Sequence, residues 1–509
     1  MQNLHYIIII FLFFSITKLN AVTSFKIPYY QQFFDLNPQV LKSSSGQYFY
    51  QNLYANLLRY NNQRGLIPDL AEKCFWKEKK TYSCLLDPKA KWSDGSPISV
   101  DDFKKSYIEF LKKNNNYPRK DFLFPIINAQ NFSEGKVSWE KVGIKTNAKK
   151  NTIDFFLNQE TVDFPYALIQ AMTVPIKNLP SINKAKELIS SGAYRIKSFS
   201  FSDQKIVFEI NPFYHRLSTQ ASKRDIEIEW IYLTEDSLQL PLYEKKELDI
   251  VRRLPTSAFK DWKNKKDFIL QEILRFDYFG FNLSQTTKYQ RELLFSSLPL
   301  DELKSILSSR GRPGCFQFDQ ELIIEKELCY PIISSTQPTS KTIFIDLKGD
   351  LTLSQAGGED HQKVAEWLQN QWQKKLNFSI NIKILENKIF MQNLKQHLPL
   401  IYRKGVPMET ASCLAALKIF EVDSPENLNH IDNKDLNQII KKLKKEISEE
   451  KKRKLCSEGL KIIMKEFYLV PTGKFDLAYL INPNFVGYEF NKLNYLSLRD
   501  LEIIKIKNP

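Results

Sequence analysis

Residues able to carry catalysis or bind a metal are scarce in this chain. None of the five histidines stands in an HExxH or comparable metal-ligand spacing. They are His5, His215, His361, His397 and His430. The sequence has no GxSxG elbow, no GxGxxG turn and no phosphate-binding loop, since RGRPGC at 310–315 lacks the closing Lys-Ser/Thr. We therefore predict no catalytic residue, no metal and no cofactor. A secreted hydrolase remains the least favoured alternative.

Six cysteines, an even number, are typical of a protein from an oxidising compartment. The segment CFWKEKKTYSC, from Cys74 to Cys84, predicts a hairpin that turns at residues 78–80. In that hairpin Lys77 pairs with Thr81, and Cys74 faces Cys84 at a distance suited to a disulfide. The residual pairs are Cys315–Cys329 and Cys413–Cys456.

An apolar stretch, IIIIFLFFSI, occupies residues 7–16 and is followed by Lys18 and Ala21. It is shorter than the roughly 20 residues that span a bilayer, so we predict a signal peptide over residues 1–21. The alternative is a buried N-terminal strand or helix. No cysteine precedes Cys74, which predicts a periplasmic protein without a lipid anchor.

Composition and charge indicate a globular protein and argue against nucleic-acid-binding and membrane-spanning classes. The chain is 43% hydrophobic and 26% charged, typical of globular proteins, and its 509 residues predict two or three lobes. Removal of Lys18 with the signal peptide lowers the net charge from +15 to +14. The densest basic run, KKLKKEISEEKKRKL at 441–455, interleaves lysines with glutamates and is typical of a solvated helix face. We expect a monomer without a nucleic-acid partner and without a transmembrane segment in the mature chain.

Strand and helix patterns alternate along the chain, which predicts an α/β fold. Alternation with period two predicts strands at 205–210, 225–233 and 378–385, the last with Phe378, Ile380, Ile382 and Ile384 on one face. Two further extended runs are expected within 141–158. Helical spacing predicts helices at 235–247, interrupted by Pro241, at 361–376 and at about 434–467. We interpret Trp367 and Trp372 as core residues of the second helix. No linker or repeat separates the lobes, so short crossings must join them.

Several stretches, taken together, resemble a known family. They include LYANLLRY (53–60), GLIPDLAEK (65–73), KWSDGSPISVDDF (91–103), SGAYRI (191–196), NPFYH (211–215), FGFNLS (279–284) and FVGYEFN (485–491). In this order they resemble the family 5 extracytoplasmic solute-binding proteins, the oligopeptide- and dipeptide-binding proteins of ABC importers. Within WSDGSP, Asp94 and Gly95 supply a turn, and Ser99 with Asp102 can cap a helix.

The resemblance implies a type II periplasmic-binding clam-shell with two main lobes and an inserted domain. Lobe I comprises 22–62, 180–270 and 475–509, inserted domain II is 63–179, and lobe III is 271–474. It also implies capture of a peptide in a cleft that closes by hinge motion and delivery to an ABC permease in the inner membrane. The alternatives are a non-peptide solute, such as a nickel chelate, haem or an oligosaccharide, and a role as a sensor.

In peptide binders of this family a carboxylate in a W-x-A-D-Y-x-x-P stretch meets the ligand α-amine. LKIFEVDSPEN at 417–427 resembles that stretch, and counting back from Pro425 puts Glu421 at the acid, with Asp423 two residues later. The resemblance therefore implies that Glu421 or Asp423 binds the ligand. The other interpretation is a loop whose acids are solvated.

Overall fold

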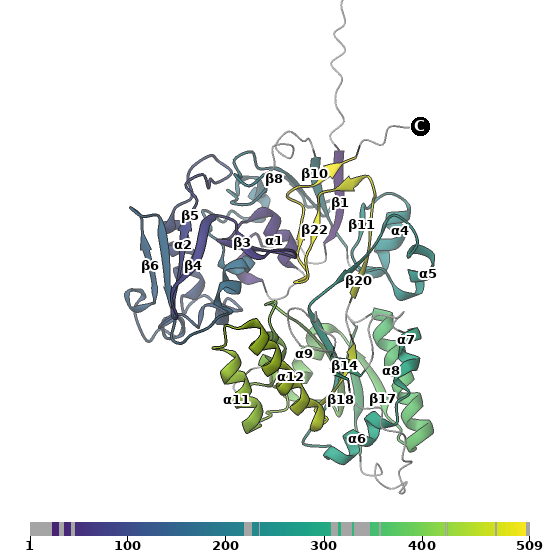
Figure 1. Cartoon of the computed structure of the whole chain (residues 1–509). Coiled ribbons are helices and arrows are strands. Elements are labelled where there is room, and N and C mark those ends of the chain that lie inside the picture. Colours follow the sequence, from purple (N-terminus) through teal and green to yellow (C-terminus); the bar gives the residue numbers. More distant parts are fainter. Residues whose placement is uncertain are drawn as a thin grey trace, which may run out of the picture.

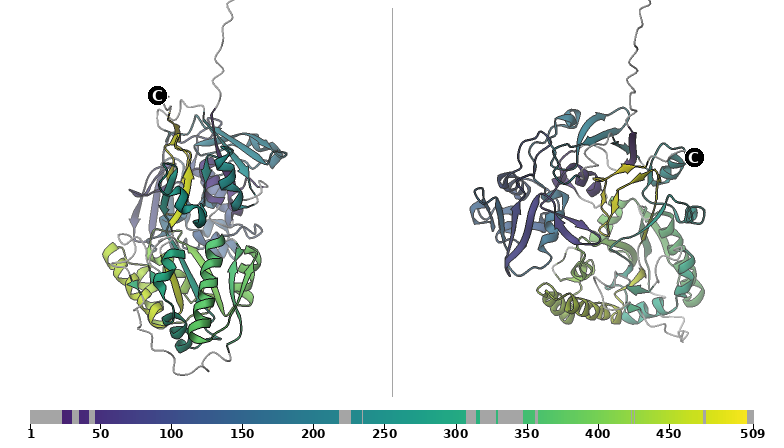
Figure 2. Two further views of the ribbon diagram at one scale, coloured as in Figure 1. Left: turned by 90° about the vertical axis from the view of Figure 1, so that its right-hand side faces the viewer. Right: turned by 45° about the horizontal axis from the view of Figure 1, so that its top comes forward.

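A computed structural model describes residues 23–29, 35–41, 46–217, 226–233, 235–306, 314–316, 328–329, 347–355, 358–422, 424, 426–473 and 476–504. The expected signal peptide lies outside these residues. The molecule has an upper part, a lower part and a third part beside the upper one (Figures 1 and 2). Each of the three parts carries a sheet of its own.

The upper part is built on a four-stranded sheet of order β1-β10-β9-β8. Its strands are β1 (Thr23–Tyr29), β10 (Ile226–Tyr232), β9 (Lys205–Ile210) and β8 (Tyr194–Ser200). The strand predicted at 205–210 is confirmed, and the one predicted at 225–233 corresponds to β10. Because alternate side chains of these strands point inward, Phe25, Phe208 and Trp230 are fully buried. Phe208 and Trp230 pack against Phe49 of α1 (Gln47–Leu53).

A smaller sheet of order β11-β20-β12 completes the upper part. It combines β11 (Ile250–Val251) and β12 (Phe268–Glu272) with β20 (Asp476–Ile481) from near the end of the chain. Helices α4 (Gln239–Glu244) and α5 (Phe259–Trp262) lie beside it (Figure 1). Pro241 does not interrupt α4 as expected: it is the third residue of the helix, where the backbone N–H that proline lacks has no partner within the helix. The chain ends in two short hairpins, β21 (Phe485–Val486) with β24 (Glu502–Ile503) and β22 (Glu489–Phe490) with β23 (Leu496–Ser497).

The lower part contains a five-stranded sheet of order β17-β16-β18-β13-β19. The strands are β17 (Asn381–Leu385), β16 (Asp350–Ser354), β18 (Ile401–Pro407), β13 (Arg275–Phe281) and β19 (Leu469–Gly473). Around it lie α6 (Lys288–Ser296), α7 (Leu303–Ile306), α8 (Gly358–Leu376), α9 (Asn387–Gln396) and the short pair β14 (Cys315–Phe316) and β15 (Leu328–Cys329).

Helix α8 confirms the helix predicted at 361–376, and Val364, Leu368 and Trp372 form its buried stripe. Trp367 is not a core residue as expected, because it is only partly buried and donates a hydrogen bond from Nε1 to Glu302 (2.9 Å). The strand after α8 begins at Asn381 rather than at residue 378. It lies at the edge of the sheet, so its outer end emerges from the core and Ile384 is 43% exposed.

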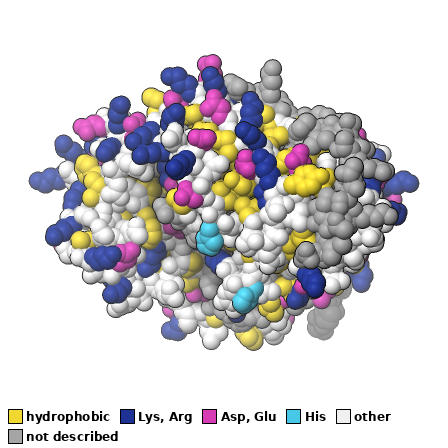
Figure 3. All heavy atoms as spheres, turned by 90° about the horizontal axis from the view of Figure 1, so that it is seen from below, with side chains coloured by type: hydrophobic (Ala, Val, Ile, Leu, Met, Phe, Trp, Pro, Cys, Tyr) yellow, Lys and Arg dark blue, Asp and Glu magenta, His cyan; other side chains and the backbone are white. Residues whose placement is uncertain are grey.

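The helix predicted at about 434–467 is two helices, α11 (Lys434–Leu443) and α12 (Glu449–Lys465). Side-chain hydrogen bonds to the backbone interrupt the helix between them. The Glu446 carboxylate accepts hydrogen bonds from the backbone N–H groups of Ile447 and Ser448, and the Ser448 hydroxyl caps α12. Leu436, Ile440 and Leu443 of α11 are buried. Figure 3 views the molecule from below and shows many Lys and Arg side chains over its left half, the side on which the third part lies in Figure 1.

Two neighbouring crossings join the upper and lower parts. Strand β12 of the upper part is followed at once by β13 of the lower part, and β19 is followed by β20 in the opposite direction. Within the upper part β12 pairs with β20, and within the lower part β13 pairs with β19, so both crossings belong to one two-stranded ribbon. Short crossings were expected, and residues 273–274 form one of them.

The third part carries a sheet of order β4-β5-β7-β6, made of β4 (Ala71–Glu78), β5 (Thr81–Leu86), β7 (Thr152–Phe156) and β6 (Ile144–Asn147). Strands β6 and β7 confirm the two extended runs expected within 141–158. Helices α2 (Val100–Leu111) and α3 (Ala129–Ser133) accompany the sheet, and the hairpin of β2 (Leu58–Asn61) and β3 (Gly65–Pro68) leads into it. Ser99 and Asp102 form the expected capping box of α2, and Gly95 turns the chain at φ +85°.

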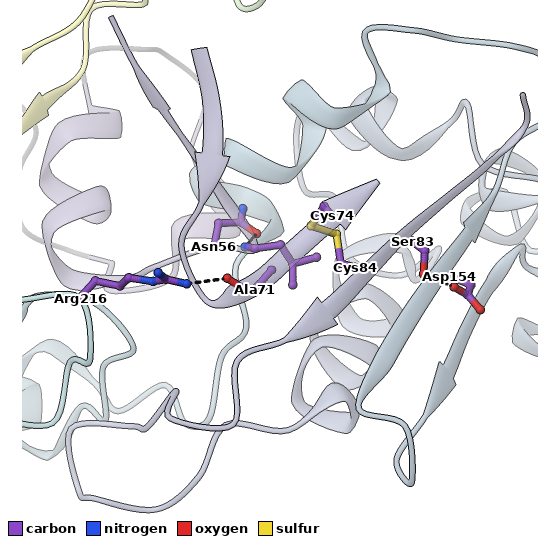
Figure 4. Close-up of a disulfide and its surroundings, with 8 residues drawn as sticks. Asn56, Ala71, Cys74, Ser83, Cys84, Asp154 and Arg216 are labelled. Carbon is purple, nitrogen blue, oxygen red and sulfur yellow. Dashed lines mark hydrogen bonds between the residues drawn. A yellow bond between two sulfur atoms is a disulfide. The ribbon is translucent and has the colours of Figure 1, made fainter. Parts of the chain in front are cut away.

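Cys74 and Cys84 are paired across β4 and β5, as predicted, and form a disulfide (Figure 4). The expected pairing of Lys77 with Thr81 is wrong: Glu78 opposes Thr81, and the register shifts between Trp76 and Glu78. Only Lys79 and Lys80 form the turn, so one residue of β4 is accommodated in a bulge. The other two disulfides are Cys315–Cys329 and Cys413–Cys456, as expected.

Candidate functional site

Open space lies between the upper and lower parts, beside the two-stranded ribbon. A hollow of about 560 Å³ is bordered from above by Thr256 and Ser257 and from below by α7 and α8. Its lower residues are Ile306, Lys363, Glu366, Trp367 and Asn370. A cleft at this place can change width when the ribbon bends, which is the requirement for capturing a solute.

A charged cluster lies on the lower sheet next to the ribbon. Asp277 of β13 is 1% exposed and accepts hydrogen bonds from Arg275 (Nε, 2.7 Å) and from Arg403 of β18 (Nη2, 3.3 Å). Gly405 lies beneath them: a Cβ there would stand 2.0 Å from Arg275 Nη2 and 2.1 Å from Asp277 Oδ1. Glycine is therefore required at this position, because any side chain would displace the cluster.

His361, in the first turns of α8, lies close to the same cluster. Burial, and then the positive charges of Arg403, Arg253 and Arg275, hold the pKa of this imidazole well below its usual value. The ring is therefore neutral at pH 7, and its Nε2 has no hydrogen-bond partner among the described residues. A neutral imidazole beside arginines suits a ligand group that is negatively charged and accepts hydrogen bonds, such as a carboxylate.

A carboxylate, Glu409, stands two residues after the end of β18. It accepts two hydrogen bonds from the guanidinium of Arg119, which belongs to the third part of the molecule. Nearby, the Ser412 hydroxyl donates to Asp163, whose pKa is raised by burial. Polar contacts thus join the third part to the lower sheet at the point where β18 ends.

Glu421, the acid expected from the sequence, lies farther along the chain. Its carboxylate accepts a hydrogen bond from Lys444, at the end of α11. Between β18 and Glu421 the chain forms α10 (Cys413–Leu417) and the 3-10 turn Lys418–Phe420, and the disulfide from Cys413 fixes α10 to α12. Asp423 lies outside the described residues.

Glu409 was missed from the sequence because the family stretch was counted back from Pro425. Glu409 is the first acid after β18, and it takes the acid's place when the family stretch is counted along that strand rather than back from Pro425. The signal that could have found it is the extended run IYRKGVP directly before Glu409. The additional residues of α10 and the 3-10 turn separate the two parts of the stretch.

Comparisons with known proteins agree with this architecture. A model of the bacterial extracellular solute-binding proteins, family 5 middle, matches residues 65–297. Residues 65–297 of this chain therefore resemble the middle region of the family 5 solute-binding proteins. The family model covers the hairpin β4–β5, the capped helix α2 and strand β13 with Arg275 and Asp277.

Curated relatives extend the likeness beyond the middle region. The periplasmic oligopeptide-binding protein OppA of Salmonella typhimurium is 21% identical over 499 residues, which cover 92% of this chain and 90% of the relative. The periplasmic murein peptide-binding protein MppA of Escherichia coli is 20% identical over 470 residues, covering 87% and 86%. These relatives are periplasmic binding proteins.

Solved structures of such proteins share the whole fold. The E. coli murein tripeptide-binding protein MppA superposes with a TM-score of 0.79 at 18% identity, covering 95% of this chain and 99% of that one. Haemophilus influenzae OppA, in complex with RPPGFSPFR, gives a TM-score of 0.75 at 19% identity and covers 94% and 99%. The predicted α/β fold of the type II periplasmic-binding class is confirmed. Among the helices described, none combines the length and the apolar character needed to cross a bilayer.

Proposed function

We propose that this chain is the capture component of an ABC importer for short peptides. The observation that carries the proposal is the two-stranded ribbon with charged groups of opposite sign beside the cleft that it spans. A ligand that contacts both the upper and the lower part stabilises the closed arrangement by its higher affinity for it. We propose the division expected from the sequence, with lobe I at 22–62, 180–270 and 475–509, domain II at 63–179 and lobe III at 271–474.

The order of charges along β18 fits a zwitterionic ligand. Arg403, Gly405 and Pro407 alternate along the strand and so share one of its faces, and Glu409 follows two residues after the strand ends. Six residues of extended chain span about 20 Å, the length of a peptide of about six residues. The peptide carboxylate lies at Arg403 and His361, and the α-ammonium lies toward the acidic end.

Two carboxylates are candidates for the ammonium. Glu409 is favoured by its position just after the end of β18 and by the family stretch counted along that strand. Glu421, or Asp423 beside it, is the second candidate, and its partner Lys444 must then be displaced by the ligand. Desolvating an ammonium is costly without a paired carboxylate, so replacement of the correct acid weakens binding strongly.

The rest of the proposal follows from this role. The protein is exported by its first 21 residues, works as a periplasmic monomer without a lipid anchor, and presents its closed form to an inner-membrane permease. It performs no catalysis. Main-chain contacts to an extended peptide give affinity that tolerates different side chains.

Native mass spectrometry of protein purified from its source is the direct test, followed by titration calorimetry with the ligands it identifies. We expect co-purified peptides, tight binding of tri- to hexapeptides with free termini, and compaction in small-angle scattering on binding. Compaction with a nickel chelate, haem or an oligosaccharide, and none with any peptide, would reject the peptide ligand. Turnover of a peptide library would reject the binding role.

A further inference from the structure

The helical hairpin of α11 and α12 has a buried side and a basic outer side. Leu436, Ile440 and Leu443 of α11, and Leu460 and Ile463 of α12, face the core of the lower part. The connector between the helices, residues 444–448, lies at one end of the hairpin. Helix α12 has 17 residues and is therefore about 25 Å long.

Exposed lysines follow the outer side of both helices. Lys451, Lys454, Lys461 and Lys465 recur on one face of α12, interrupted only by Glu458. The corresponding lysines of α11 and its C-terminal end are Lys434, Lys441, Lys442 and Lys445. None of these eight lysines forms an ion pair with a described residue, so all eight ammonium groups are available to a partner.

The glutamates that interleave with these lysines in the sequence are largely used within the protein. Glu446 accepts hydrogen bonds from the connector backbone, Glu449 pairs with Lys452 (2.7 Å) and Glu466 pairs with Lys288 (3.2 Å). The acids that share the outer side are Asp435, Glu450 and Glu458. Folding therefore converts a mixed run of charges into a face on which lysines predominate.

One apolar side chain stands at the end of this face. Ile447, in the connector, is 71% exposed, and Lys445 and Lys451 flank it along the chain. An exposed aliphatic side chain among lysines is characteristic of segments that rest on a lipid surface, where the apolar group enters the interface and the ammonium groups meet phosphates.

We propose that the outer face of the α11–α12 hairpin docks on an anionic phospholipid surface. The eight lysines match the negative charge of the headgroups, and the single exposed isoleucine matches the apolar interior of the bilayer. A lysine ammonium acts as a point charge, so it can bind phosphates without a fixed geometry. The interaction is reversible and is screened by salt. It holds the protein near a membrane independently of the peptide in its cleft.

Vesicle flotation of the mature protein tests the proposal, with phosphatidylglycerol–phosphatidylcholine vesicles (1:1) against pure phosphatidylcholine at low salt. We expect binding to the anionic vesicles only, and its loss at high salt. K441Q/K445Q/K451Q/K454Q should weaken this binding at least tenfold, and Ile447→Asp should weaken it severalfold. A matched control, K149Q/K150Q/K263Q/K266Q, removes the same charge from exposed positions elsewhere.

Equal weakening by the hairpin and control variants would overturn the proposal, because net charge alone would then explain the binding. Absence of binding to the anionic vesicles, or retained binding by the hairpin variant, would also overturn it. Circular dichroism and peptide titration on both variants verify that each is folded and that the cleft is intact. Binding of the hairpin to an acidic protein surface but not to the vesicles would assign it to a protein partner instead.

Discussion

The guanidinium of Arg119 donates two hydrogen bonds to the carboxylate of Glu409, which lies 290 residues later in the chain. The pair connects the third part of the molecule to the end of β18. If Glu409 receives the peptide ammonium, the ligand competes with Arg119 for one carboxylate. The pair then keeps the carboxylate oriented until a peptide arrives.

Replacement of Glu409 by Gln tests this assignment. We expect the affinity for peptides with a free amine to fall by about 2 kcal/mol or more, roughly 30-fold, because a desolvated ammonium loses its counter-charge. N-acetylated peptides should bind the variant and the parent equally. Arg119→Met is the matched control in titration calorimetry: it removes the same ion pair, and with it the ligand's competitor, but keeps the carboxylate, so affinity should not fall.

Replacement of Glu421 by Gln separates the second candidate from the first. If the ammonium is bound by Glu409, this variant should leave the dissociation constant unchanged and only remove the pair with Lys444. A loss of about 2 kcal/mol here, together with an unaffected Glu409→Gln variant, would reassign the ammonium to Glu421.

His361 should make stability depend on pH. Its pKa is lowered in the folded protein by burial and by the neighbouring arginines, whereas in the unfolded chain it returns to about 6.5. The free energy of unfolding therefore keeps its full value above pH 6.5, where His361 is neutral in both states. As the pH falls from 6.5 toward the folded pKa, protonation of the unfolded chain lowers this free energy by up to about 1.4 kcal/mol per pH unit.

Urea unfolding at pH 7.5, 6.0 and 5.0 measures this effect. His361→Gln should have a flatter profile between pH 6.5 and 5.0 than the parent. His430→Asn is a suitable control, since His430 is exposed and has a positive φ (51°) that asparagine tolerates. A parent and a His361→Gln profile of equal slope would contradict the prediction.

The disulfides should differ in what they contribute. Cys74 and Cys84 are separated by 10 positions, and Cys413 and Cys456 by 43. In the chain-entropy model the first closure stabilises the folded state by about 3 kcal/mol and the second by about 4 kcal/mol. Thermal and urea unfolding of the two double-serine variants should thus show a larger loss for the second; the reverse order would contradict the model for this chain.

The capping box of α2 offers a smaller, local effect. Ser99 accepts a hydrogen bond from the backbone N–H of Asp102, whose side chain accepts one from the Ser99 N–H (2.8 Å). Ser99→Ala should lower the free energy of unfolding by about 1 kcal/mol. Ser181→Ala, at an exposed N-cap that forms no side-chain cap hydrogen bond, should change it little; similar losses from both would contradict a capping effect.

Local sequence patterns predicted most of the helices and strands. The helix break and the ion pairs of the candidate site could not be predicted, because they depend on individual side-chain contacts. Period two located β9, and four-residue spacing located α8, because each depends on one buried face. The break between α11 and α12 depends on where Glu446 and Ser448 direct their oxygens, which periodicity does not report. The partners of Glu409 and Glu421 come from segments distant in sequence, so their ionic contacts could not be deduced from motifs.

The position of β20 has a consequence for biogenesis. This strand lies between β11 and β12, yet it is made only at residues 476–481, and the Gln47 side chain hydrogen-bonds to Tyr495, 448 residues away. The upper part lacks a central strand and its closing contacts until the ribosome has nearly finished. A nascent chain kept incomplete in this way stays unfolded until synthesis is nearly complete, which is what the proposed export requires.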